Sequence, residues 1–182
     1  ADKVTNGDAA LSEQFCLART YAIEAGQDLA ANVQGVSADQ IEDHQVCSSH
    51  PWNPESEVHG THLSRLAGLE RTGVSRVRIP PGKESFVYHA HQREEEWVYI
   101  LSGRGVAEID NQEHPVGPGD FMAFPTPSAA HHLRNTGAED LVYLMGGENL
   151  HCDVVDFPRL GKRMVRLDDD ITVYELDAGQ DF

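Results

Sequence analysis

The stretch HAHQREEEW at residues 89–97 contains residue types that bind divalent metal ions. His89 and His91 are two positions apart, so on a β-strand their side chains point to the same face. With a turn near residues 92–94, Glu96 falls on the next strand and can face the same interior. Neutral imidazoles together with a carboxylate form a mixed nitrogen and oxygen donor set, which suits Fe(II), Mn(II), Ni(II), Co(II) or Zn(II). The stretch therefore predicts part of a metal site.

A second pair of histidines, His131 and His132, follows the turn PTPS at 125–128. On a strand these neighbours point to opposite faces, so one of them can join the first pair. Neither stretch contains cysteine, which argues against a structural thiolate zinc site. Three imidazoles and one carboxylate would leave one or two positions of an octahedral ion open, and an open position is what metal chemistry on a substrate requires.

Short β-strands are the elements that must position these residues. From about His62 the chain alternates short runs, many of them carrying Val, Ile, Tyr or Phe, with turn-forming segments such as PPGK, SGRG and GPGD. Close and regular spacing of such runs indicates a sandwich or small barrel. The expected strands cover residues 63–69, 74–79, 85–91, 96–101, 105–110, 121–124, 129–135 and 141–145.

The two histidine-containing stretches resemble the two signature motifs of the cupin superfamily. The first motif is matched by Gly82, His89, His91, Glu96 and Gly103, with one extra residue between Gly82 and His89. The second motif is matched by Gly119, Pro125, His131 and Asn135. Ser128 stands where the family has a glycine, and the turn carries one extra residue.

The resemblance implies an all-β fold, a jelly-roll β-barrel (double-stranded β-helix). It also implies a divalent metal ion, Fe, Mn, Ni, Co or Zn, and the asparagine spacing of the second motif selects His131 over His132. The implied metal ligands are His89, His91, Glu96 and His131.

The resemblance covers roughly residues 75–150, and the rest of the chain is assigned from composition. Residues 1–46 are predicted to form an N-terminal helical extension, with one helix over about 9–34 and another that begins at Ser37, where S-A-D-Q has a capping-box pattern. Such an extension would serve as a lid, an oligomerisation arm or a shield over the barrel mouth. The cupin barrel is expected over 47–150, and a C-terminal strand or tail over 151–182 is expected to pack on it.

A rival cluster lies in CSSH at 47–50 and HGTH at 59–62, which place one cysteine and three histidines in a zinc-like pattern. Pro51 and Pro54 indicate a loop here, so we expect no strand or helix to hold the two pairs together. Glu94 and Glu95 are expected in a solvated turn, and His132 is expected to point away from the metal.

Composition limits the partners. Acidic residues outnumber basic ones 30 to 14, and the formal net charge of −16 repels phosphate backbones and anionic lipid. No apolar run approaches the roughly 20 residues that a membrane helix requires. Cys16, Cys47 and Cys152 are far apart and odd in number, which argues against a disulfide scaffold and favours a reducing cytoplasm. We therefore expect neither a nucleic-acid nor a membrane partner.

The expected function is that of a metal-dependent cupin acting on a small organic molecule. Because a fold does not select a reaction, several functions remain open. A dioxygenase-type oxidoreductase is favoured, since the site resembles those of cupin dioxygenases. A non-catalytic ligand-binding or sensing cupin and a sugar-type isomerase are the alternatives. Cupins often pair through an edge strand or an outer sheet, so a homodimer is expected, and deleting residues 1–46 should change oligomer size before metal content.

Overall fold

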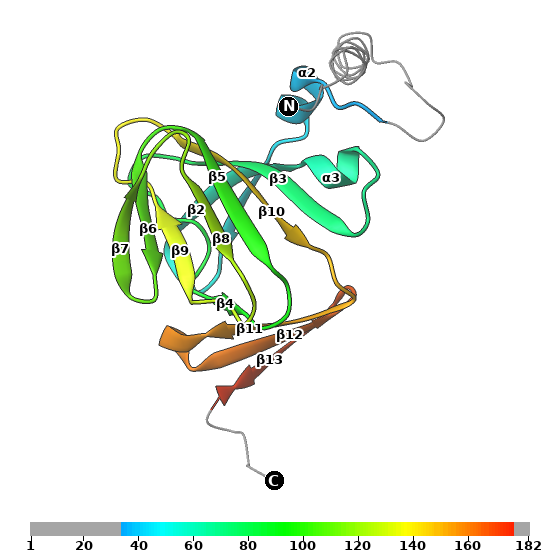
Figure 1. Ribbon diagram of the computed structural model, residues 1–182, viewed down its shortest axis with the longest axis vertical. Coiled ribbons are helices and arrows are strands. Elements are labelled where there is room, and N and C mark those ends of the chain that lie inside the picture. Colours follow the sequence, from blue (N-terminus) through cyan, green and yellow to red (C-terminus); the bar gives the residue numbers. More distant parts are fainter. Residues whose placement is uncertain (1–33, 177–182) are drawn as a thin grey trace, which may run out of the picture.

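The computed structural model describes residues 34–176, while residues 1–33 and 177–182 lie outside the described part. Most described residues belong to three β-sheets (Figure 1). The six-stranded sheet has the order β1 (Val46–His50), β2 (Asn53–His62), β3 (Thr72–Ile79), β10 (Leu141–Glu148), β5 (Glu96–Ser102) and β8 (Phe121–Phe124). The three-stranded sheet has the order β7 (Gln112–Val116), β6 (Gly105–Ile109) and β9 (His131–Arg134).

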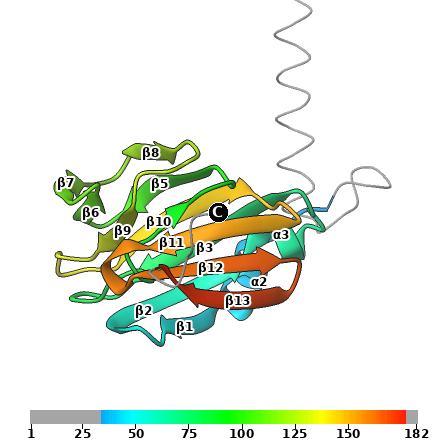
Figure 2. The same ribbon diagram turned by 90° about the horizontal axis from the view of Figure 1, so that it is seen from below.

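The third sheet, which we call the C-terminal sheet, is built mainly from the end of the described chain. Its strand order is β13 (Asp170–Glu175), β12 (Lys162–Leu167), β11 (Cys152–Phe157) and β4 (Ala90–His91). Figure 2 shows β11, β12 and β13 side by side along one side of the molecule. The short strand β4 carries His91 and pairs with β11, so this sheet reaches the predicted metal site.

The all-β fold is confirmed, whereas the hydrogen-bonded strands do not close into one continuous barrel. One gap between the sheets arises because the expected strand 85–91 is not continuous. Only Ala90–His91 forms a strand there, while His89 meets His131 in an isolated bridge. The closed jelly-roll barrel therefore stays a prediction.

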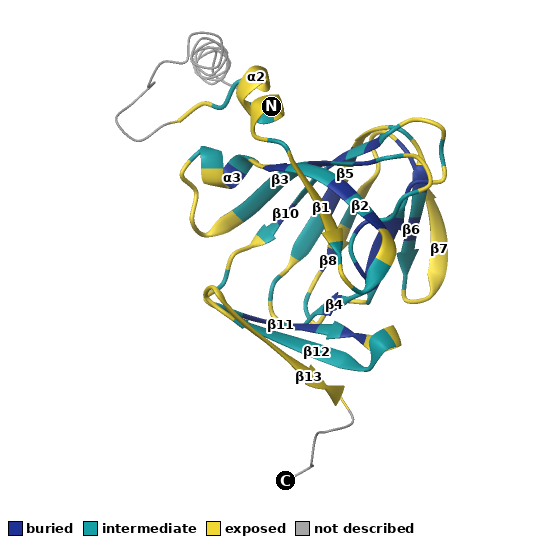
Figure 3. Ribbon diagram, turned by 180° about the vertical axis from the view of Figure 1, so that it is seen from behind, coloured by how far each residue is buried: buried dark blue, intermediate teal, exposed yellow. Residues whose placement is uncertain are grey.

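The main core is formed by side chains from the six-stranded and three-stranded sheets together. Side chains alternate along β5, where Val98 and Ile100 are buried and Tyr99 between them is exposed. Figure 3 shows that most residues of β7 and all of β13 are exposed. The core residues are Val58, Val77, Ile79, Val98, Ile100, Ala107, Val116, Phe124, Leu133, Leu141 and Tyr143.

Gly103 explains why the first motif closes on a glycine. Its φ of +81° is in the left-handed region, which L side chains rarely adopt. A Cβ atom at this position would lie 2.9 Å from the Cα of Leu141, so a side chain would also clash with backbone. The glycine lets the chain turn from β5 into β6 and thereby positions the strand that carries Glu96.

Several local predictions can be compared with the described residues. The helix α2 (Ala38–Asp43) has Ser37 as its N-cap, and both hydrogen bonds of the capping box with Gln40 are present, so this prediction is confirmed. The helix expected over 9–34 falls almost wholly outside the described residues. No described helix has the length and apolarity needed to cross a membrane.

Three local predictions were wrong. Residues 46–62 form the β1–β2 hairpin rather than an irregular segment, because its prolines fall in the turn and near the start of β2. The expected strand 63–69 begins with the helix α3 (Leu63–Leu66). The C-terminal segment contributes β11, β12 and β13 instead of one strand, with the 3-10 turn η1 (Pro158–Leu160) between the first two.

Candidate metal centre

The structure brings the four predicted ligands together where three sheets meet. His91 lies on β4, Glu96 begins β5 and His131 begins β9, while His89 bridges to His131. Nε2 of His131 is 3.0 Å from Oε2 of Glu96, and Nε2 of His91 is 3.5 Å from the same oxygen. The imidazole of His89 has its centroid 4.8 Å from that of His131 and 5.0 Å from that of His91. Ligand atoms of His89, Glu96 and His131 all lie within 4.8 Å of one another.

Hydrogen bonds to backbone carbonyls orient two of the three imidazoles. Nδ1 of His89 donates to the carbonyl of Val87 at 2.7 Å, and Nδ1 of His131 donates to the carbonyl of Ala129 at 2.9 Å. When Nδ1 carries the proton, Nε2 of a neutral imidazole has a free lone pair. The backbone therefore fixes the tautomer that a metal ligand needs, and these donors fit a divalent ion.

Burial governs the electrostatics of the site. Burial, reinforced by the neighbouring His131, lowers the pKa of His89 from 6.5 to about 4, so this ring is neutral at physiological pH. Burial by itself would raise the pKa of Glu96, but the hydrogen bond with His131 and the nearby imidazoles outweigh it and lower that pKa. A neutral imidazole beside an ionised carboxylate is the state in which both bind metal.

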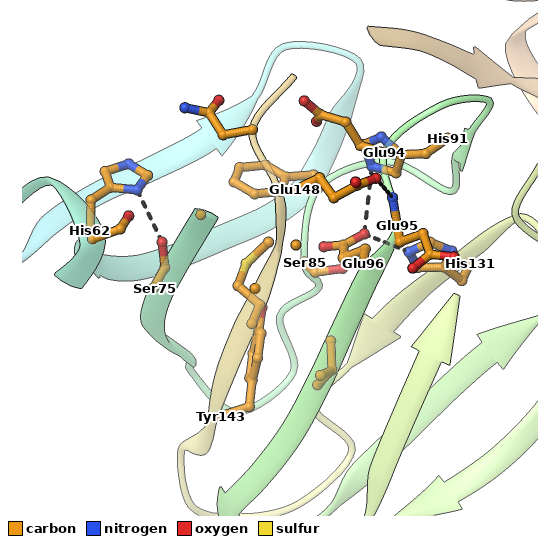
Figure 4. Close-up of a pocket in the computed structure, with 18 of the residues that line it drawn as sticks. His62, Ser75, Ser85, His91, Glu94, Glu95, Glu96, His131, Tyr143 and Glu148 are labelled. Atoms are coloured by element: carbon orange, nitrogen blue, oxygen red, sulfur yellow. Dashed lines mark hydrogen bonds and ion pairs between the residues drawn. The ribbon is translucent and has the colours of Figure 1, made fainter. Parts of the chain in front are cut away.

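A cavity of about 420 Å³ opens onto these residues (Figure 4). Glu94, Glu95 and Glu148 line the cavity on the side of the predicted ligands His91, Glu96 and His131. His62 and Ser75 are hydrogen-bonded on the opposite side, at 3.0 Å. The expectation that Glu94 lies in a solvated turn was wrong, because its side chain is only 14% exposed and binds Arg166.

Sequence reasoning missed Asp153, which is 1% exposed and lies on β11. Its Oδ2 accepts a hydrogen bond from Nδ1 of His91 at 2.6 Å. Burial alone would lower the pKa of His91, but this hydrogen bond and the charge of Glu96 outweigh it and raise the pKa. The two residues are 62 positions apart, and no local sequence signal links them.

Two other residues in the second motif, His132 and Asn135, make structural contacts. His132 is buried and points to the other face of β9, where its ring packs edge-on against Tyr88 with centroids 5.7 Å apart. The amide of Asn135 donates to the carbonyls of Ile79 at 2.7 Å and Glu139 at 2.8 Å. Asn135 therefore holds the turn after β9 in place and is not a ligand.

The rival cluster is better ordered than its sequence indicated. Because β1 and β2 form a hairpin, Cys47 lies directly opposite His59. Ligand atoms of Cys47, Glu57 and His59 lie within 4.8 Å of one another, and Nε2 of His59 is 3.1 Å from Glu57. The cysteine is exposed, and His50 and His62 do not join the group. Strands thus hold part of the rival cluster together, contrary to expectation.

Comparisons with known proteins agree with the fold and the motifs. A family model described as Cupin domain matches residues 75–147. The oxalate-binding protein of Thermotoga maritima is 37% identical over 92 residues, which are 50% of this chain and 74% of that protein.

Two solved structures cover more of the chain. A candidate sugar phosphate isomerase from Acidithiobacillus ferrooxidans has 36% identity and a TM-score of 0.77, over 81% of this chain and 95% of that one. A sugar phosphate isomerase of the cupin superfamily from Silicibacter pomeroyi has 25% identity and a TM-score of 0.72, over 79% and 94% of the two chains. Matched motifs, shared fold and similarity along the length of these relatives lead to one conclusion: the chain belongs to the cupin superfamily.

Proposed function

We propose that this protein is a metal-dependent enzyme that isomerises a small sugar phosphate. The observation that carries the proposal is the convergence of His89, His91, Glu96 and His131 at a cavity of about 420 Å³. Cavities of this size take small organic molecules. The metal would be one of Fe, Mn, Ni, Co or Zn, all of which accept this donor set.

The four ligands would hold the ion, which when bound supplies Lewis-acid polarisation of a substrate carbonyl. Interconversion of an aldose and a ketose also moves a proton between neighbouring carbons, so it needs a positioned acid or base. Glu94, Glu95 and Glu148 line the same cavity and provide carboxylates for this step. The similarity to the two isomerase structures supports isomerisation over the dioxygenase hypothesis.

The far end of the cavity supports an anionic substrate. His62 lies at this end, and Arg65 of the helix α3, which follows His62, also lines the cavity. A guanidinium binds phosphate oxygens through two parallel hydrogen bonds. The phosphate of the substrate would lie at Arg65, with the carbonyl end directed towards the metal.

The test combines metal analysis with a panel of aldose and ketose phosphates. Protein loaded separately with Mn(II), Fe(II), Co(II), Ni(II) or Zn(II) is expected to interconvert one pair without consuming O₂. His131→Ala should lose bound metal and activity together, whereas Cys47→Ser, which removes the sulfur of the rival cluster, should keep both. Oxygen uptake with no isomer formed would favour a dioxygenase instead.

Arg65→Gln tests the position of the phosphate. Loss of a charged hydrogen bond costs about 1.5–3 kcal/mol, so KM should rise about 10-fold or more with little change in kcat. Arg71→Gln is the matched control, because Arg71 is close in sequence and does not line the cavity. An unchanged KM in Arg65→Gln would contradict the proposed orientation.

A second candidate is a non-catalytic binder of small dicarboxylates. It is favoured by the oxalate-binding relative, of which this chain matches 74%. Calorimetry with oxalate on metal-loaded protein decides between the two. Binding of oxalate without turnover of any sugar phosphate would support the binder.

A further inference from the structure

The C-terminal sheet provides the hydrogen-bond acceptor for one of the three histidines of the proposed metal site, and this acceptor is a carboxylate rather than a backbone carbonyl. Nδ1 of His89 and of His131 donate to carbonyls only two residues away. Nδ1 of His91 instead donates to the carboxylate of Asp153, which lies on β11. The matching family model ends at residue 147, so this partner comes from outside the matched domain.

Asp153 is held in its position by a second contact. Its Oδ1 accepts a hydrogen bond from the backbone amide of Glu94 at 3.2 Å, while Oδ2 binds His91 at 2.6 Å. The side chain is 1% exposed, and a buried carboxylate is costly unless donors compensate it. These two donors are provided by the segment that carries the HxH pair.

Further polar contacts join the same two segments. Val155 and Asp156 of β11 pair with His91 and Ala90 of β4. Asp156 accepts from the side chain of Gln92 at 3.0 Å, and Glu94 binds Arg166 of β12. The sheet is therefore fixed against the loop between the HxH pair and Glu96.

Asp153 is not itself placed as a ligand. The 2.6 Å separation between Nδ1 of His91 and Oδ2 is a hydrogen-bond distance, and it leaves no room for an ion between these atoms. A ligand atom of Glu94 also lies within 4.8 Å of those of His91 and Asp153, but its Oε1 already accepts from the amide of Leu150 at 2.7 Å. Nε2 of His91 remains directed at Glu96, 3.5 Å away.

We infer that Asp153 is a positioning residue, which holds His91 in the tautomer and orientation that present Nε2 to the metal, and that β11 is thereby part of the metal site. This inference rests on the proposed metal site. A carboxylate that accepts from the second nitrogen of a histidine fixes its tautomer and raises its basicity as a ligand. The metal and the docking of the C-terminal sheet would then stabilise each other.

The test measures Co(II) affinity of the full chain by absorbance titration. Asp153→Asn keeps the shape of the side chain and removes its charge, and we expect the affinity to fall about 10- to 100-fold. Asp170→Asn is the matched control, since it makes the same change at an exposed residue of the same sheet and should stay within about 3-fold of the wild type. Equal affinity of Asp153→Asn and wild type would overturn the inference, whereas a wild type that binds no Co(II) would instead overturn the metal site.

A second measurement separates positioning from a general loss of structure. In metal-free wild-type protein at alkaline pH, where the imidazoles are neutral, ¹⁵N NMR should show His91 with its proton on Nδ1. Asp153→Asn should change the His91 signals and leave those of His89 and His131, whose partners are backbone carbonyls, unchanged. If all three sets of signals moved together, or none moved, Asp153 would not act through His91.

Discussion

At the scale of single residues, burial and one hydrogen bond per ring decide what each histidine can do. His89 and His131 depend on carbonyls of their own strand segments, so their orientation follows from local backbone. His91 depends on Asp153, and its orientation follows from the fold. Imidazoles that look equivalent in the sequence thus differ in what keeps them in place.

The lowered pKa of His89 predicts a pH dependence of stability in the metal-free protein. The unfolded histidine titrates near 6.5 and the folded one near 4, so between these values the unfolded state binds a proton that the folded state does not. The free energy of unfolding should therefore fall as pH decreases from 6.5 to 4, by up to about 1.4 kcal/mol per pH unit. His91, whose pKa is raised, acts in the opposite sense near pH 6.5 and is protonated in both states only in the lower part of the window.

Urea unfolding of the metal-free protein at several pH values between 4.5 and 6.5 measures this slope. His89→Gln should flatten it, whereas His114→Gln, which changes an exposed histidine, should not. A slope in His89→Gln equal to that of the wild type would contradict the prediction.

At the scale of elements, the C-terminal sheet is held by a small apolar cluster of its own. Val155 and Phe157 of β11 pack with Val87, and Trp52, Leu160 and Met164 are packed against them. The rings of Trp52 and Phe157 meet edge-on with centroids 5.2 Å apart. This cluster joins the sheet to the β1–β2 turn and to the residues just before His89.

Phe157→Ala tests the docking of this sheet. Removing a buried phenylalanine costs about 3–5 kcal/mol, so the free energy of unfolding should fall by about that amount. Ile171→Ala on β13 is the control, because Ile171 is 60% exposed and its truncation should change stability by less than about 0.5 kcal/mol. Chemical denaturation followed by tryptophan fluorescence measures both, and similar values for the two variants would show that the cluster does not hold the sheet.

At the scale of the whole molecule, charge and exposed apolar residues determine which partners fit. The net charge of −16 disfavours nucleic acid and anionic membranes. The edge strand β13 exposes Ile171, Val173 and Tyr174, and an exposed edge of this kind favours pairing with another chain. A homodimer remains our expectation.

Deletion of residues 1–46 tests the prediction about oligomer size. This change removes α2, whose Ile41 carbonyl accepts from the hydroxyl of Thr61 at 2.6 Å on β2, far in sequence from the four predicted ligands. We expect the oligomer size in light scattering to change while metal content per chain stays constant. Loss of metal with unchanged size would contradict the assignment of residues 1–46 to assembly.

The sequence by itself identified the family and the four predicted ligands that the fold brings together. A strand alternates its faces, so spacing alone places His89 beside His91, and the motif glycine Gly103 marks a turn that other residues resist. Only the tertiary structure decided that Asp153 supports His91, that Glu94 is withdrawn from solvent and that Cys47 faces His59. These contacts join strands through register and sheet packing, and spacing along the chain contains no information about which distant strands will meet.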